Sequence, residues 1–237
     1  MVLSPYLDLF GAVLIFGICY ARNFHGTIYH NGEIEFGIPF RELWSYVKLG
    51  AYPLGVLSTV GAIFSMLATR FVGKQKNSGN VLGVITTVNS GANDFLFGNA
   101  SAIITYPLSF MLHSFSFFKW KKGIEIRKID SFYFFIVGFG LCLGFALVYL
   151  GAYIFGGRTD SLFLITVALT FGLSLGANFS NAFKYEETWL SWAVYNVIQL
   201  VKAFLQINIA NVVKYAFYLF NSAITLLDWK WNGDRPQ

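Results

Sequence analysis

Charged residues are scarce in this chain. Only 12% of its 237 residues are Asp, Glu, Lys or Arg, about half the density of an average soluble domain. By contrast, 56% are hydrophobic and the mean hydropathy is +0.57. The apolar residues form long runs rather than the short alternations of half-buried strands. A soluble domain would have to hide too much apolar surface, so the composition predicts an all-α integral membrane protein that crosses the bilayer several times.

Cysteine and histidine are also rare, which excludes several kinds of site. Cys19 and Cys142 both fall in apolar runs, so we expect packed thiols with no disulfide and no metal role. The three histidines (His25, His30 and His113) do not combine with Asp or Glu at metal-ligand spacing. No nucleophile motif and no phosphate-cradling glycine loop is present. The sequence therefore predicts no enzyme, no cofactor and no metal, and we expect a neighbouring group to satisfy His113.

Basic residues do not point to nucleic acid despite the net charge of +5. The charges lie in short loops between apolar runs, as membrane topology requires. No Lys or Arg precedes the first apolar run, and Asp8 interrupts its start. A cleavable signal needs a basic region there, so this run is expected to be a retained helix.

Several apolar runs approach the length of about 20 residues that a membrane-spanning helix needs. We expect spans near 6–21, 51–69, 80–96, 98–118, 131–155, 161–182, 188–205 and 208–228. The segment 38–49 mixes charges with aromatics and is typical of an interfacial helix. Lys and Arg concentrate in the loops 70–79 and 119–130, above all in KWKKGIEIRK (119–128). The positive-inside rule then places both termini in the cytoplasm.

The order of the spans suggests an internal repeat. Very short connections, FGN (97–99) and QIN (206–208), join the last two helices of two triplets. Three spans reverse orientation, so one linker helix lets both triplets point the same way. We therefore expect two parallel three-helix repeats joined by a linker (3+1+3). The expected units are an N-terminal helix with the interfacial segment (1–50), the first repeat (51–118), the linker (131–155), the second repeat (161–228) and a cytoplasmic tail (229–237).

Polar side chains follow four of the spans as stripes at helical spacing. The stripe in 188–205 falls within an arc of roughly 80°. Such groups normally face a bundle interior or a watery cavity, although hydrogen bonds between helices explain any single stripe as well. Trp189 is also consistent with an anchor at the membrane interface. The stripes are Thr86, Asn89, Ser90 and Asn93 with Asp94 beside them; Thr170, Ser174, Asn178 and Asn181; Trp189, Trp192, Asn196 and Gln199; and Asn208, Asn211, Tyr215 and Tyr218 with Lys214 at their edge.

The chemistry of these stripes indicates a small organic ligand. Aromatic faces stack on a planar ring and attract a cation by roughly 0.5–2 kcal/mol. Amide side chains offer donors and acceptors to hydroxyls or to a carboxamide. Because acids are few and bases are not clustered, a highly charged phosphate is a poor match. We expect a ligand that is neutral or singly positive, part aromatic and part polyol.

Several stretches resemble the PnuC family of bacterial vitamin B3 transporters over roughly residues 50–230. They are WLSWAVYNVIQL (189–200) with its WxxWxxxNxxQ spacing, ANFSNAFKYEE (177–187), LLDWKW (226–231) and NDFLFGNASAIITYP (93–107). The resemblance implies transport of nicotinamide riboside by facilitated diffusion, with cytoplasmic phosphorylation trapping the substrate for NAD biosynthesis. It also implies a 3+1+3 plan related to the SWEET sugar transporters and a homotrimer in the bacterial inner membrane.

The candidate substrate-binding residues come from the motif and from the stripes. The motif contributes Trp189, Trp192, Asn196 and Gln199, and the stripes contribute Asn178, Asn211, Tyr215, Asn89 and Asn93. We expect alternating access to a site between the two triplets. Two alternatives stay open: a related transporter for another vitamin or a sugar, and a retinal-binding photosensor with Lys214 as its Schiff-base lysine. No Asp or Glu lies on the WxxW face, and Asp94 is the acid that could supply ion coupling.

Overall fold

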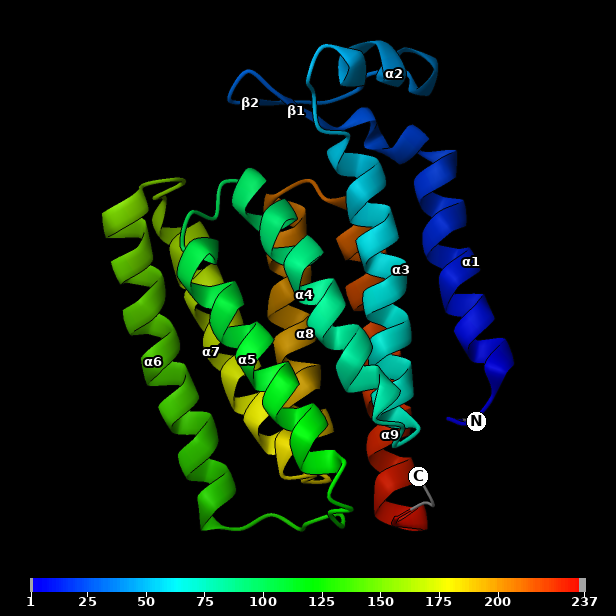
Figure 1. Cartoon of the computed structure of the whole chain (residues 1–237), viewed down its shortest axis with the longest axis vertical. Coiled ribbons are helices and arrows are strands. Elements are labelled where there is room, and N and C mark those ends of the chain that lie inside the picture. The colour runs from blue at the N-terminus through cyan, green and yellow to red at the C-terminus, as the bar shows by residue number, and fades with distance from the viewer. Residues whose placement is uncertain (1, 235–237) are drawn as a thin grey trace.

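The apolar runs fold into long helices that lie side by side in one bundle (Figure 1). The computed structural model describes residues 2–234. Within these residues the bundle helices are α1 (Pro5–Ala21), α3 (Leu54–Gly73), α4 (Ser78–Leu96), α5 (Ala102–Trp120), α6 (Ser131–Phe155), α7 (Ser161–Ala182), α8 (Thr188–Leu205) and α9 (Ile209–Asn232). Each matches a predicted span, with ends that shift by a few residues. Both termini lie at the same end of the bundle, as an even number of spans requires (Figure 1).

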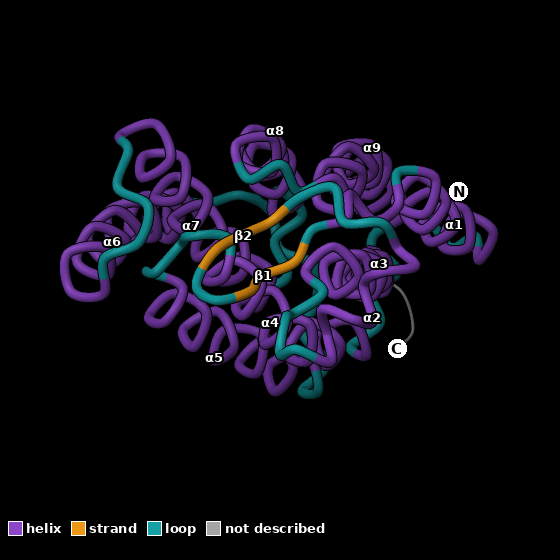
Figure 2. The backbone as a smooth tube through the Cα atoms, turned by 90° about the horizontal axis from the view of Figure 1, so that it is seen from above, coloured by secondary structure: helices purple, strands orange, loops and turns teal. Residues whose placement is uncertain are grey.

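Three bundle helices in the described part of the chain, α3, α6 and α7, qualify as membrane-spanning by length and hydropathy alone. Helix α1 is apolar but shorter. Helices α4, α5, α8 and α9 are long enough, but they carry the polar groups described below. Seen from above, α6 and α1 lie at opposite ends of the bundle (Figure 2). Helix α6 packs on α7, and α1 packs on α3 and α9.

The end opposite the termini carries a small cap. It contains the 3₁₀ turn η1 (Asn23–Gly26), the antiparallel strands β1 (Ile28–His30) and β2 (Glu33–Glu35), and helix α2 (Phe40–Lys48). Helix α2 confirms the predicted helix within 38–49. The hairpin was not predicted. Its turn is Asn31–Gly32, and both residues have positive φ angles, as a tight hairpin turn requires (Figure 2).

Two helices extend past their predicted ends, and the extensions bury groups that we expected in loops. Arg70 lies inside α3 with no exposed surface; its guanidinium donates to Asp8 of α1 at 2.7 Å and to Asn221 of α9 at 2.8 Å. Lys74 also pairs with Asp8. The predicted tail begins as the last turn of α9, where the Trp229 indole donates to the Gly73 carbonyl at 2.9 Å. Residues 235–237 of that tail lie outside the described residues.

Smaller differences concern helix starts and one thiol. Helix α5 begins at Ala102 rather than near 98, because Gly98 takes a φ of 94° in the preceding turn. Asp130 caps α6, and the Tyr133 amide and the Tyr185 hydroxyl that donate to its carboxylate lower the pKa of Asp130. Cys19 is buried as expected, but Cys142 lies exposed on α6.

Glycines let α6 and α7 approach closely. A Cβ on Gly140 would lie 2.8 Å from the Gly176 nitrogen, and one on Gly144 would overlap Gly172. Small residues at this spacing are typical of membrane helix pairs, because close backbones gain van der Waals contact. Helix α6 is therefore held closely against α7.

We predict that Gly144→Val destabilises the protein by roughly 1–3 kcal/mol or more, because the added side chain forces α6 away from α7. Thermal unfolding of the detergent-purified protein measures the effect. Gly138→Val is the matched control, because a Cβ there meets nothing within 4 Å. Equal melting temperatures for the two variants would contradict the close packing.

Candidate functional site

The four predicted polar stripes meet at one cavity inside the bundle. Its empty volume is about 880 Å³, part of which is open to solvent. Helices α3, α4, α5, α7, α8 and α9 all contribute to its wall. Its lining includes Thr86 and Ser90, Ser174, Asn178 and Asn181, Trp189, Trp192 and Asn196, and Lys214, Tyr215 and Tyr218.

Two indoles form the end of the cavity nearer the termini. Trp189 is only 1% exposed and packs edge-on against Trp229, with ring centroids 5.6 Å apart. This burial rules out an interfacial anchor for Trp189. Trp192 is half-buried one turn further in, with its ring centroid 5.1 Å from that of Tyr195. The cavity thus has aromatic surface where a planar ring can pack.

Amide oxygens beside these indoles lack hydrogen-bond partners within the described residues. The Asn196 amide donates to Ser222 and the Asn178 amide donates to Ser174, both at 3.2 Å, yet the side-chain oxygens of both asparagines are buried and unpaired. The Asn181 side-chain oxygen and the Trp189 indole nitrogen are unpaired as well. Leaving a buried polar atom unpaired costs about 1–3 kcal/mol, so such a cluster marks a place that favours a polar ligand.

His113 also lines the cavity, and its expected neighbour is missing. Its Nδ1 atom is buried and forms no hydrogen bond with the described residues. The prediction that a neighbouring group satisfies His113 is therefore wrong for this atom. The ring lies against Gly83 of α4, where a Cβ would be 2.8 Å from Nδ1.

Tyrosines continue the wall from Trp192. The rings of Tyr195, Tyr215 and Tyr218 meet edge-on in series, with centroids 6.0 and 5.7 Å apart. The Tyr218 hydroxyl lies 2.9 Å from the Ser65 hydroxyl. Tyr106 and Tyr195 were not among the predicted residues. The spacing of Tyr195, three residues after Trp192, was available as a signal, whereas Tyr106 lies one residue before Pro107 in an apolar run.

The remaining predicted residues lie in two adjoining spaces rather than in the main cavity. Gln199 lines one of about 340 Å³ and donates to the Tyr195 hydroxyl at 2.6 Å. Asn89, Asn93 and Asn211 line another of about 380 Å³, where the Asn93 amide donates to Asn89 at 3.0 Å. Tyr106 borders all three spaces, so they are neighbours.

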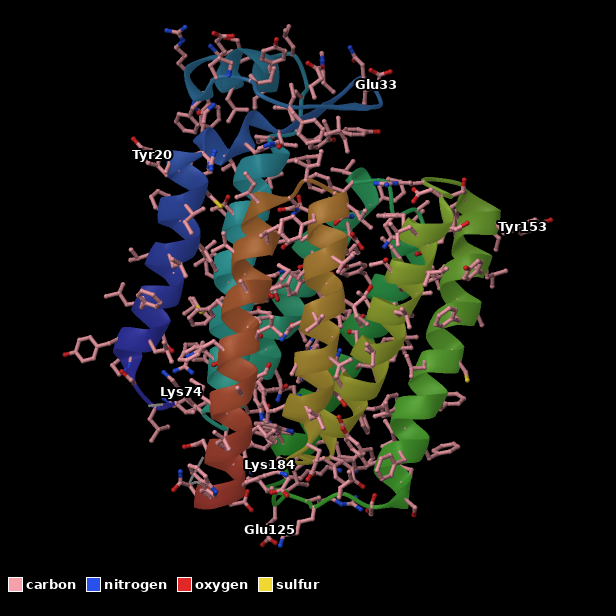
Figure 3. All side chains as sticks on the ribbon, turned by 180° about the vertical axis from the view of Figure 1, so that it is seen from behind. Tyr20, Glu33, Lys74, Glu125, Tyr153 and Lys184 are labelled. Atoms are coloured by element: carbon pink, nitrogen blue, oxygen red, sulfur yellow. The ribbon has the colours of Figure 1, made fainter. Side chains whose placement is uncertain are left out.

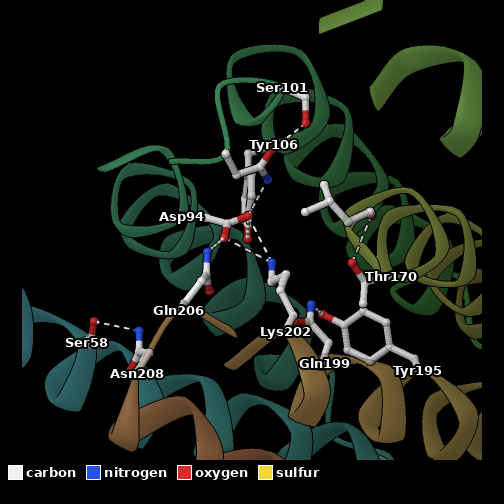
Figure 4. Close-up of polar contacts among 12 residues, drawn as sticks. Ser58, Asp94, Ser101, Tyr106, Thr170, Tyr195, Gln199, Lys202, Gln206 and Asn208 are labelled. Carbon is white, nitrogen blue, oxygen red and sulfur yellow. Dashed lines mark hydrogen bonds and ion pairs between the residues drawn. The ribbon is translucent and has the colours of Figure 1, made fainter. Parts of the chain in front are cut away.

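A buried ion pair joins the last turns of α4 and α8, at the end of the bundle away from the termini. Figure 4 shows its side chains. The Lys202 ammonium lies 3.0 Å from both Asp94 carboxylate oxygens, and both side chains are only 6% exposed. Gln206 and Asn99 donate to the same carboxylate at 2.8 and 2.6 Å. Asp94 is thus fully engaged, and Lys202 and Gln206 are partners that the stripes did not reveal.

Weaker bonds join the two triplets at the other end. The Asn181 amide of α7 donates to Asn80 of α4 at 3.2 Å, and the Trp120 indole of α5 donates to the Asn181 carbonyl at 2.8 Å. Basic residues gather nearby, among them Lys74 and Lys184 (Figure 3). Lys184 pairs with Asp234 at 2.6 Å. Ion pairs are therefore present towards both ends of the bundle, and the hydrogen bonds that join α4 and α5 to α7 at this end are between uncharged groups.

Comparisons with known proteins agree with this architecture. A family model described as nicotinamide mononucleotide transporter matches residues 55–231. The crystal structure of the vitamin B3 transporter PnuC has a similar fold, with a TM-score of 0.66 and 16% identity; the match covers 96% of this chain and 91% of that chain. No curated protein sequence matches.

We predict that Asp94→Asn destabilises the protein by about 3 kcal/mol or more, because it leaves the Lys202 ammonium buried without a charge partner. Thermal unfolding in detergent measures the loss. The double variant Asp94→Asn/Lys202→Met should recover much of it, since no unpaired charge remains. A double variant no more stable than Asp94→Asn would contradict the ion pair.

Proposed function

Because the chain belongs to the nicotinamide mononucleotide transporter family, we propose that it carries nicotinamide riboside across the bacterial inner membrane by facilitated diffusion. The family is one of membrane transporters of vitamin B3 compounds, so the chain is a multi-pass membrane transporter and not an enzyme. The choice of the riboside, the mode of transport and the particular membrane are the proposal.

The observation that carries the proposal is the meeting of indole rings and unpaired amide oxygens in one cavity. Trp189 and Trp192 supply faces for a cationic pyridinium ring. The unpaired oxygens of Asn178 and Asn196 can accept from the NH₂ of a carboxamide. Nicotinamide riboside combines both groups with a ribose, whose hydroxyls suit the tyrosine side of the wall.

The distribution of acids supports diffusion without ion coupling. The main cavity has no Asp or Glu in the part of its wall that the structure describes. Asp94 borders the adjoining spaces but is held by Lys202 and two amides. Asp8 is likewise engaged, by Arg70 and Lys74. In the arrangement that the structure describes, each of these acids therefore has basic partners and none of them faces the main cavity.

The contacts at the two ends of the cavity support a mechanism of alternating access. The triplets α3–α5 and α7–α9 flank the cavity, with α6 between them in the chain. Rocking one triplet against the other would break Asp94–Lys202 when one end opens and Asn80–Asn181 when the other opens. The family resemblance also supports cytoplasmic termini and a homotrimer.

The rival ligands remain distinguishable by competition. A sugar would use the amides and tyrosines but not the indole faces to the same extent, and another vitamin would present a different ring. A retinal photosensor would need an acid beside Lys214, and no described Asp or Glu forms an ion pair with it.

A competition experiment separates the other ligands. Excess thiamine, riboflavin or glucose should not displace labelled nicotinamide riboside. If one of these compounds displaces the labelled riboside, that compound becomes the proposed substrate.

We predict that Trp192→Ala weakens binding of nicotinamide riboside by roughly 10-fold or more, because one stacking face is lost. Asn196→Ala should weaken it by roughly 5-fold through a lost hydrogen bond. Isothermal titration of the purified protein measures both affinities. Trp231→Ala is the matched control, because Trp231 is 78% exposed and far along α9. Unchanged affinity in both cavity variants would refute this binding site.

A further inference from the structure

Lys214 is a buried cation that nothing in the proposed mechanism uses so far. It lies on α9, is 5% exposed, and borders both the main cavity and the adjoining space that holds Asn211. Its ammonium lies 4.3 Å from the centroid of the Tyr215 ring and 6.0 Å from that of Tyr218. In residues 2–234, no hydrogen bond or ion pair reaches it.

The other buried cations in the described chain all have a carboxylate partner. Arg70, Lys74, Lys184 and Lys202 each pair with a carboxylate. Burying an unpaired charge inside a membrane bundle costs free energy, and such charges are found mainly at functional sites. The tyrosine ring attracts the ammonium but accepts none of its three N–H donors in the way an oxygen does. Those donors are therefore available to a ligand in the cavity.

Lys214 and the indoles lie at different depths in the bundle. Helices α8 and α9 are antiparallel and meet at the turn around Gln206–Asn208. At 1.5 Å per helical residue, Trp192 lies about 20 Å from this turn and Lys214 about 8 Å. Their separation along the bundle is thus roughly 10 Å, comparable with the length of a nucleoside. A ligand packed on Trp192 can reach Lys214 with its far end.

The charge of the Lys214 ammonium determines which end of the ligand lies next to it. An ammonium repels a pyridinium cation and attracts hydroxyl or phosphate oxygens. We propose that Lys214 binds the oxygen-bearing end of the ligand, a ribose hydroxyl or a 5′-phosphate, and so orients the ring towards Trp192. This inference rests on the proposed function. It makes Lys214 a residue that distinguishes a nucleoside or nucleotide from the free base.

The test compares three ligands on two purified full-length proteins, wild type and Lys214→Met. Isothermal titration gives the affinities for nicotinamide, nicotinamide riboside and nicotinamide mononucleotide. We expect Lys214→Met to weaken mononucleotide binding by roughly 10-fold or more, and riboside binding by a similar factor where the partner is a ribose hydroxyl. Nicotinamide binding should stay within about twofold, since the free base has neither ribose nor phosphate. Lys122→Met, on an exposed loop, is the matched control and should change none of these affinities.

The mononucleotide identifies the oxygen that Lys214 contacts. If Lys214→Met weakens binding of the mononucleotide and leaves riboside binding unchanged, the phosphate is the partner; if it weakens both by a similar factor, a ribose hydroxyl that the two share is. Unchanged affinity for both the riboside and the mononucleotide, or an equal loss for nicotinamide, would overturn the proposal. Should Lys214→Met fail to fold by size-exclusion chromatography, Lys214→Gln replaces it, with the same ratio as readout. A wild type that binds none of the three refutes the proposed function itself, whereas failure of the Lys214 inference alone leaves wild-type binding intact.

Discussion

The ion pair between Asp94 and Lys202 is the contact around which the polar interior is organised. It bridges α4 of the first triplet and α8 of the second, and Gln206 and Asn99 satisfy further lone pairs of the carboxylate. A buried pair is tolerated in a membrane bundle only when its remaining hydrogen-bonding capacity is used in this way. The pair borders both adjoining spaces and holds α4 against α8 there.

The rest of the polar interior divides into groups that are paired and groups that are not. Arg70 joins α1, α3 and α9 through Asp8 and Asn221, and these bonds lie away from the cavity. The side chains of Asn178, Asn181, Asn196 and Trp189 line the cavity, and each has a buried polar atom without a hydrogen-bond partner among the described residues. The paired groups hold the helices together, whereas each unpaired atom retains the capacity to form one more hydrogen bond.

The sequence predicted the helices well, because each membrane span is a long run of apolar residues. Contacts between residues far apart in the sequence leave no such local pattern. The stripes correctly indicated which faces of α4, α7, α8 and α9 turn inward. Arg70 was predicted to lie in a loop, because a charged residue at the end of an apolar run usually marks the end of a span. Its burial is explained by the position of Asp8, which forms an ion pair with it in the fold. The Asn31–Gly32 hairpin had a recognisable turn signal that its three-residue strands made easy to overlook. Lys202 pairs with a residue 108 positions away, which no local pattern reveals.

The contacts that join the helices at the two ends of the cavity differ in kind, and this difference bears on how easily each end separates. At the end near the termini, opening between α4 and α7 breaks the hydrogen bond of two neutral amides, Asn80 and Asn181. At the other end, opening between α4 and α8 separates Asp94 from Lys202, and both charges then need water. Net hydrogen bonds between neutral groups contribute about 1 kcal/mol, and those to charged groups about 1.5–3. Separating α4 from α7 alone therefore costs less than separating α4 from α8. The Trp120–Asn181 and Arg70–Asn221 bonds also join helices across the bundle towards the termini, so opening that end requires breaking a hydrogen bond to a buried guanidinium as well.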